Sequence, residues 1–193
     1  MFNHGVSVQD VDLLSRLNLY FDRLDQRLEQ GQGWLIFNSS RERGARIVRL
    51  LLERLDDYRP FVSLFHVPWR DFALHAYIST VALPRDAALI EGDEVDSSRR
   101  REFSIASQVA NATAFQLAYA DLVILSNIDP AQPHETIALT QTVVERAAHH
   151  RAIIALTSHD PWSLAEAFGA ADPSGTTWRH FFGAVRESSL IAL

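Results

Sequence analysis

The strongest constraint on the fold is the alternation of short apolar segments with longer segments of helical spacing. Short, mostly apolar runs are typical of strands covered on both faces, and helical connections imply right-handed crossovers between parallel strands. We therefore predict a three-layer α/β fold, a mainly parallel sheet with helices on both faces. The predicted strands are WLIF (34–37), FVSLFHV (61–67), AALIE (87–91), DLVIL (121–125) and AIIAL (152–156), with SSLIAL (188–193) as an edge strand.

Apolar residues spaced three and four apart predict the helices between these strands. The segment 69–83 is ambiguous, although helical spacing recurs at Phe72, His75, Ala76 and Ser79. The predicted helices are 42–57, 100–120, 133–149 and 162–170.

The N-terminal segment predicts one long amphipathic helix before the first strand. It begins at Ser7, with Asp10 three residues later as in a capping box, and Gly31 and Gly33 end it. We favour packing of its apolar stripe on the protein's own domain, and the alternative is a partner-binding or dimerising helix. The stripe consists of Leu14, Leu17, Phe21, Leu24 and Leu28.

Length and composition limit the classes of function. A chain of 193 residues suits one well-buried core, so we predict one domain over 1–193, made of an N-terminal helix (1–33) and a core (34–193). The net charge of −6 makes a nucleic-acid partner unlikely. The chain has no cysteine, which excludes disulfides, zinc–thiolate sites and cysteine nucleophiles. Neither a secretory signal nor a membrane-length apolar run is visible, so we expect a cytoplasmic protein.

The turn after the first predicted strand, NSSRERG (38–44), has the position of a phosphate-binding loop without its chemistry. The phosphate loop GxxxxGK[ST] needs two glycines, a lysine for the phosphates and a hydroxyl for Mg²⁺. If the second glycine is Gly44, the other three positions hold Ser39, Ala45 and Arg46. All 18 basic residues of the chain are arginine, so every mechanism that requires a lysine is excluded.

An arginine-based phosphate site is the alternative at this turn. A serine can cap the following helix, whose first N–H groups attract anions, and an arginine can supply the fork that lysine cannot. Ordinary helix capping with solvated arginines is the favoured interpretation. The candidate phosphate-binding residues are Ser39, Ser40, Arg41, Arg43, Gly44 and Arg46.

The order of elements from 34 to 162 resembles a RecA/KaiC-like P-loop NTPase. The similar segments are WLIFNSSRERGARIVRLLLERL, AALIEGDEVD, YADLVILSNIDPAQ and AIIALTSHDPW. In that family the strand corresponding to DLVIL ends in an acidic residue that holds Mg²⁺ through water. Ser126 and Asn127 take this place here, and Asp129 comes three residues late. The resemblance therefore implies the fold with weakened or lost nucleotide function, as in non-catalytic members that act as sensors, inhibitors or scaffolds.

Acidic residues after two predicted strands form a candidate metal site. Carboxylate oxygens suit Mg²⁺, but a solvated acidic loop is the favoured interpretation, so we expect no cofactor, with ATP or GTP and Mg²⁺ as the alternative. His159 and Asp160 follow another strand, where Asp160 is predicted to cap the next helix rather than orient the imidazole. The candidate metal ligands are Glu91, Asp93, Glu94 and Asp129.

Together these observations predict a catalytically degenerate P-loop NTPase-like protein. It would act as a regulatory or scaffolding subunit through protein–protein contacts, with a second copy or another protein as its partner, including an active NTPase relative. The alternative is a Mg²⁺-dependent NTPase or phosphoryl-transfer enzyme with an arginine-based phosphate site. No catalytic residue is assigned.

Overall fold

The computed structural model describes residues 8–56, 61–80 and 97–193. The predicted strand AALIE and the candidate metal ligands Glu91, Asp93 and Glu94 lie outside these described residues. Within them, no helix is both long and apolar enough to cross a membrane.

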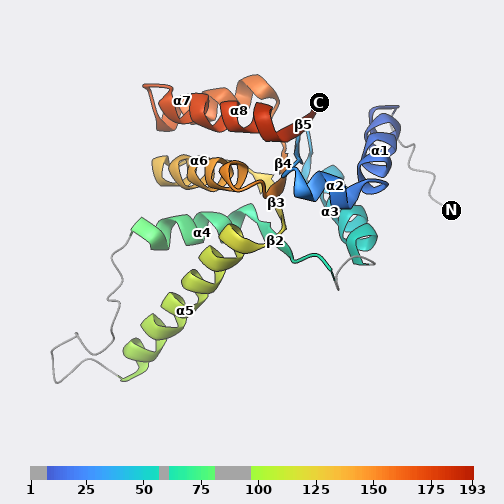
Figure 1. The fold of residues 1–193 in the computed structure, drawn as a ribbon. Helices are drawn as coiled ribbons and strands as arrows, with labels where there is room; N and C mark the ends of the chain where they lie inside the picture. Colours follow the sequence, from blue (N-terminus) through green and yellow to red (C-terminus); the bar gives the residue numbers. More distant parts are fainter. Residues whose placement is uncertain (1–7, 57–60, 81–96) are drawn as a thin grey trace.

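The centre of the fold is a parallel sheet with the strand order β2-β3-β4-β1-β5 (Figure 1). Each neighbouring pair is parallel, so the predicted α/β sheet is confirmed, and the predicted edge strand pairs with β1. The strands are β1 (Gly33–Ile36), β2 (Leu64–Pro68), β3 (Leu122–Ile128), β4 (Ala152–Thr157) and β5 (Ser189–Ala192).

Helices cover both faces of this sheet, as predicted (Figure 1). One face carries α1 (Val8–Phe21), α2 (Leu24–Glu29) and α3 (Arg41–Asp56). The other carries α4 (Trp69–Thr80), α6 (Pro133–Ala148), α7 (Pro161–Ala171) and α8 (Thr176–Ser188). The remaining helix, α5 (Ser97–Tyr119), extends away from the sheet.

Three segments of the chain differ from the prediction in their helices. The N-terminal segment forms two helices because a turn at 22–23 interrupts it, and both Phe21 and Leu24 on either side of the turn are buried. The ambiguous segment 69–83 contains a helix, α4. Helix α8 was not predicted, and it begins after Gly175, whose φ of 65° is a left-handed conformation that glycine adopts readily.

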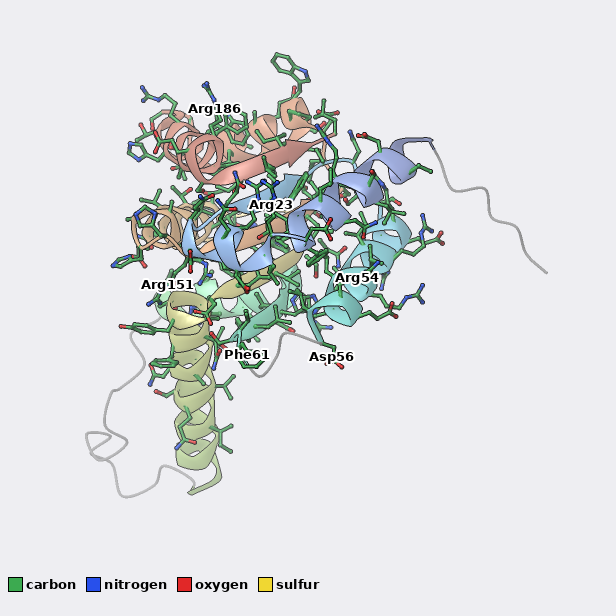
Figure 2. The ribbon with its side chains drawn as sticks, turned by 45° about the vertical axis from the view of Figure 1, so that its right-hand side comes forward. Arg23, Arg54, Asp56, Phe61, Arg151 and Arg186 are labelled. Carbon is green, nitrogen blue, oxygen red and sulfur yellow. The ribbon has the colours of Figure 1, made fainter. Side chains whose placement is uncertain are left out.

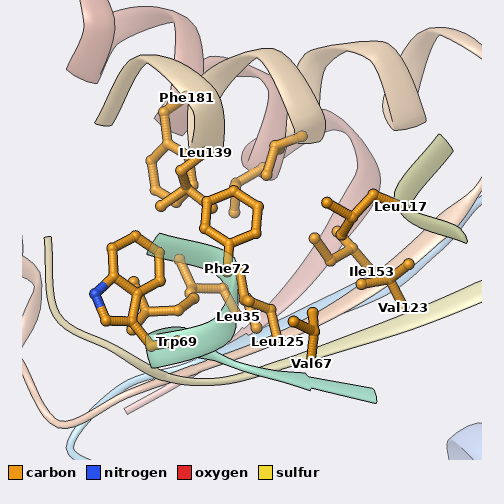
Figure 3. Packing of buried hydrophobic residues seen from close by; sticks show 14 of the residues in the cluster. Leu35, Val67, Trp69, Phe72, Leu117, Val123, Leu125, Leu139, Ile153 and Phe181 are labelled. Carbon is orange, nitrogen blue, oxygen red and sulfur yellow. The ribbon is translucent and has the colours of Figure 1, made fainter. Parts of the chain in front are cut away.

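Strand side chains alternate between two apolar cores. On one face, Phe72, Leu139 and Phe181 from three helices pack over strand residues such as Leu35 and Val123 (Figure 3). On the other face, residues of α1, α2 and α3 pack over alternate strand positions, for example Trp34, Ile36 and Ile124. Because successive strand residues point to opposite faces, a sheet covered twice needs strands that are apolar throughout.

The N-terminal stripe belongs to the second of these cores. Leu17, Phe21 and Leu24 are buried there, and Leu14 and Leu28 are half-buried. The favoured interpretation, packing on the protein's own sheet, describes these contacts. These three buried side chains therefore present no free surface to a partner. Their burial gives no support to the alternative, in which the stripe binds a partner.

Candidate functional site

The candidate site lies where the parallel strands end. In an open parallel sheet, ligands bind outside the carboxyl ends of the strands. The structure brings three of the predicted polar turns to this carboxyl edge: residues 37–40 after β1, 126–129 at the end of β3, and 157–160 at the end of β4. These turns decide what the edge can bind.

The turn between β1 and α3 is too short for the phosphate-loop register that places the second glycine at Gly44. Helix α3 already begins at Arg41, so Gly44 lies inside the first turns of the helix and not in a loop. A Cβ added at Gly44 would lie 3.5 Å from Asn127 Oδ1 and 3.7 Å from the Ser39 carbonyl oxygen, which are ordinary contact distances. Gly44 therefore occupies a helical position that does not require glycine.

Backbone N–H groups of this turn donate to the neighbouring strands and their extensions. Asn38 N donates to His159 O at 3.0 Å, and Ser39 N donates to Thr157 O at 2.8 Å. Phe37 N donates to Ala192 O at 2.9 Å. A phosphate cradle needs such N–H groups to converge on the anion, and here they bind protein carbonyls instead.

The carbonyl groups of the same turn face an arginine. Arg43 Nη1 donates to Phe37 O at 3.3 Å and to Asn38 O at 3.1 Å. Ser40 Oγ accepts from the Arg43 N–H at 3.4 Å, so this serine caps α3 as ordinary helix capping predicts. Arg41 and Arg46 are exposed on the first turns of the helix. The guanidinium of Arg43 thus holds the turn closed.

Ser39 is the candidate phosphate residue that this network leaves unsatisfied. Its side chain is 2% exposed, and its Oγ has no hydrogen-bond partner among the described residues. A buried hydroxyl without a partner is costly and is a recognised mark of a functional or strained position. It is the one polar atom of the turn that favours a bound ligand.

A neutral pair lies at the strand end where the resembled family has its acidic residue. Ser126 Oγ is 3.0 Å from His66 Nε2, and Ser126 is buried. Burial lowers the pKa of His66, and the carboxylate of Asp71 partly opposes this shift. The pair borders a groove of about 370 Å³ between α3 and the ends of β2 and β3.

The end of β3 also differs from the predicted strand. The pairing of β3 with β4 shifts register between Leu125 and Ile128, and Asn127 inside this irregularity has a φ of 58°. Because the strand continues to Ile128, Asp129 follows its end directly rather than three residues late. Asparagine tolerates the left-handed conformation, and bulges re-aim side chains near strand ends.

Asp129, and not Asp160, is the carboxylate that contacts His159. His159 Nε2 lies 2.7 Å from Asp129 Oδ1, although Asp129 is mostly exposed to solvent. Asp160 instead caps α7, because its Oδ1 accepts from Trp162 N at 2.8 Å and Ser163 N at 2.9 Å, which confirms the predicted cap. These N–H groups, that of Ser163 above all, lower the pKa of Asp160.

The described part of this edge does not match the donor set of a Mg²⁺–nucleotide site. No group of three or more His, Asp or Glu side chains within residues 8–56, 61–80 and 97–193 is arranged to hold a metal ion. The turn N–H groups and the Arg43 guanidinium bind the protein itself.

The opposite, amino edge of the sheet holds a buried arginine that sequence analysis missed. Arg146 is 2% exposed and donates to the carbonyl oxygens of Leu117 at 2.7 Å, Ala120 at 2.8 Å and Ala152 at 2.6 Å. Burial lowers its pKa to about 10. Arg146 thus joins the end of α5 to the start of β4.

Comparison with known proteins supports the fold. No family model and no curated protein matches the sequence. Among solved structures, the crystal structure of the DnaC helicase loader is similar, with a TM-score of 0.59 over 98% of this chain and 92% of that chain. The two sequences are 8% identical, so this similarity concerns the fold alone. The chain therefore has an α/β fold, a parallel sheet between two layers of helices, similar to the fold of the DnaC helicase loader.

Proposed function

We propose that this protein is a cytoplasmic regulatory or scaffolding subunit that acts through protein contacts and has lost nucleotide binding at the turn between β1 and α3. The observation that carries the proposal is the closed hydrogen-bond network of this turn. Asn38 N and Ser39 N donate to carbonyls at the end of β4, while the Phe37 and Asn38 carbonyls accept from Arg43. A triphosphate would have to replace these bonds before it could bind.

The energetics favour the closed turn. Each intramolecular hydrogen bond contributes about 0.5–1.5 kcal/mol net, and the turn makes several such bonds that a ligand would have to replace. A phosphate that drew Arg43 away would leave two carbonyls to find new donors. A phosphate loop normally holds its N–H groups ready for the anion, so the arrangement here supports structural use of the turn.

The groups around the turn also support loss of catalysis. Phosphoryl transfer in P-loop proteins relies on a lysine and on a Mg²⁺ ion held partly by an acidic residue. The chain contains no lysine, and the uncharged Ser126 stands at the expected acidic position beside His66. A partner protein, either an active NTPase relative or a second copy, would then supply what this fold does not.

Isothermal titration tests the proposal directly. The full chain is titrated with ATP and with GTP, with and without Mg²⁺, and we expect no saturable heat at ligand concentrations up to the millimolar range. A nucleotide dissociation constant in the micromolar range that disappears in Arg43→Ala would overturn the proposal. Arg49→Ala is the matched control, because it removes the same charge from an exposed position further along α3.

The unpartnered Ser39 hydroxyl favours one second candidate, a nucleotide-binding, Mg²⁺-dependent enzyme with an arginine-based phosphate site. In that case Ser39 and Arg43 would rearrange around the phosphates, and Ser39→Ala would weaken binding together with Arg43→Ala. The same titrations therefore separate the two candidates. Measurable hydrolysis lost in both variants would establish the second.

A further inference from the structure

Helix α5 presents large apolar side chains to solvent between Ile105 and Tyr119. The helix extends away from the sheet in both views of the molecule, and only its last turns pack against α4 and α6 (Figures 1 and 2). Four large side chains on its outer face are more than half exposed: Ile105 (54%), Val109 (58%), Phe115 (58%) and Tyr119 (57%). Large apolar side chains gathered on one exposed side of a helix are typical of an interaction site.

The outer face is symmetric about Ala112. Val109 and Phe115 lie three residues on either side of it, and Ile105 and Tyr119 lie seven residues on either side. At 3.6 residues per turn, all of these positions fall within about 60° of Ala112 around the helix axis. The exposed glutamines at 108 and 116 are also equidistant from Ala112, at four residues.

A sequence that has the same pattern in both directions suits a two-fold axis. In an isologous interface both subunits use the same surface. If residue i of one subunit contacts residue j of the other, then residue j of the first also contacts residue i of the second. We propose that α5 pairs antiparallel with α5 of a second copy of this chain, and that the two helices cross at Ala112. This geometry places Ile105 against Tyr119 of the partner subunit and Val109 against Phe115 of the partner subunit.

The small residue at the centre and the large residues beside it fit this crossing. Helices approach to about 8–10 Å between axes, and the smaller distances require small side chains at the contact. Ala112 provides this at the crossing point, and the larger side chains flank it on both helices. An unrelated partner would require no such symmetry about one residue.

Charge distribution agrees with an antiparallel pair. The sequence has no charged residue from Phe103 to Ala120, so the crossing carries no like-charge repulsion.

The contact involves one helix from each subunit, so the expected affinity is moderate. Stable interfaces bury about 800 Å² per partner, and a single helix pair offers less. We therefore expect a dissociation constant in the micromolar range. Self-association through α5 does not depend on the proposed loss of nucleotide binding, because the helix lies away from the carboxyl edge.

Sedimentation equilibrium of the full chain tests the dimer over a range from about 1 to about 200 μM. We expect a reversible monomer–dimer equilibrium, weakened at least tenfold in the double variant Val109→Glu/Phe115→Glu. The matched control is Leu19→Glu/Trp162→Glu, which adds the same charge at exposed apolar positions on α1 and α7 and is expected to dimerise like the parent. Circular dichroism establishes that both variants remain folded.

Cysteine cross-linking tests the register without relying on the charged variants. Because the chain has no cysteine, each introduced thiol is unique. Ala112→Cys is expected to form a disulfide with its own copy, since disulfides need Cα atoms within about 7 Å. Gln116→Cys should not link to itself, but should link to Gln108→Cys when the two variants are mixed.

Three results would overturn the proposal. The first is a monomer at every concentration, and the second is a dimer that Val109→Glu/Phe115→Glu leaves unchanged. The third is self-linking of Gln116→Cys as efficient as that of Ala112→Cys, which would contradict the antiparallel crossing. Nucleotide titration of the same samples distinguishes failure of this dimer from failure of the proposed function.

Discussion

The two edges of the sheet each hold an arginine that donates to backbone carbonyls, but the two arginines differ in burial and reach. Arg43 at the carboxyl edge is half-buried and binds two carbonyls of its own turn. Arg146 at the amino edge is almost fully buried and binds carbonyls of α5, the connection to β3, and β4. The same chemistry closes one local turn in the first case and joins distant segments in the second.

The difference follows from what surrounds each guanidinium. A buried charge is costly unless polar groups compensate it. The Arg146 guanidinium therefore needs these carbonyls as acceptors, and the buried carbonyls need it as a donor. Two of these acceptors lie at the carboxyl end of α5, where the helix dipole favours a cation. Arg43 retains access to water, which can replace its bonds at lower cost. We therefore expect the amino edge to control global stability and the carboxyl edge to control local closure.

The largest expected effect is that of Arg146→Ala. The substitution removes the Arg146 donor from three buried carbonyls, and at about 1–3 kcal/mol each we expect a loss of about 3 kcal/mol or more in the free energy of unfolding. Urea denaturation measures this loss. Arg186→Ala on the exposed side of α8 is the control, expected to remain within about 0.5 kcal/mol of the parent. A loss below about 1 kcal/mol at Arg146 would remove the contrast between the edges.

The next largest effect is expected for α1, which contacts the amino edge through Tyr20. Its Oη donates to Gln32 O at 2.7 Å. Leu17 is fully buried beside Tyr20, whereas Leu19 on the same helix is 63% exposed. Leu17→Ala should cost about 2–5 kcal/mol through the lost packing and the cavity, and Leu19→Ala less than about 0.5 kcal/mol. Equal effects in thermal or urea unfolding would mean that the stripe is not core.

The sequence predicts the sheet well and the contacts at its edges poorly. Strands such as AIIAL are apolar throughout because helices cover both sheet faces, so local pattern and tertiary structure agree. Arg146, by contrast, follows Glu145 near the end of α6 and has the pattern of a solvated helix end. Its burial depends on α5 arriving from a distant part of the chain. The pairing of Asp129 with His159 likewise needs β3 and β4 to be neighbours.

The turn after β1 shows the same limit. Its position was predicted from the strand and helix that flank it, and Ser40 does cap the helix. Its closure could not be predicted, because Asn38 N and Ser39 N bind carbonyls more than a hundred residues later in the chain. Residue types give the location of a turn, while the direction of its N–H groups depends on the adjacent strands.

A smaller effect is expected at the carboxyl edge from Arg43→Ala. Two hydrogen bonds to partly exposed carbonyls are lost, water can replace them, and we expect a loss of about 1 kcal/mol in urea denaturation. Hydrogen exchange of the Asn38 and Ser39 amides should rise more than that of the β4 amides, because only the turn loosens. A loss as large as that of Arg146→Ala would show that both edges control the global fold.

The smallest expected effect comes from the negative charge of Asp160, the residue that caps α7 at the carboxyl edge. Hydrogen bonds from Ser163 N and Trp162 N hold the pKa of Asp160 below its ordinary value of 3.8 in the folded protein. The unfolded chain therefore binds the proton more readily, so the contribution of this carboxylate is complete above that value and is lost as the pH falls through the lower folded pKa.

Asp160→Asn isolates this contribution, because asparagine caps helices as well as aspartate does but does not titrate in this range. We expect nearly unchanged stability at neutral pH and a shallower fall of the urea midpoint in acid. The fall should not disappear, because hydrogen bonds from Ser174 and Thr177 also lower the pKa of Asp172 between α7 and α8. Identical acid profiles for parent and variant would mean that the cap acts through geometry alone, and that the carboxyl edge draws no stability from this charge.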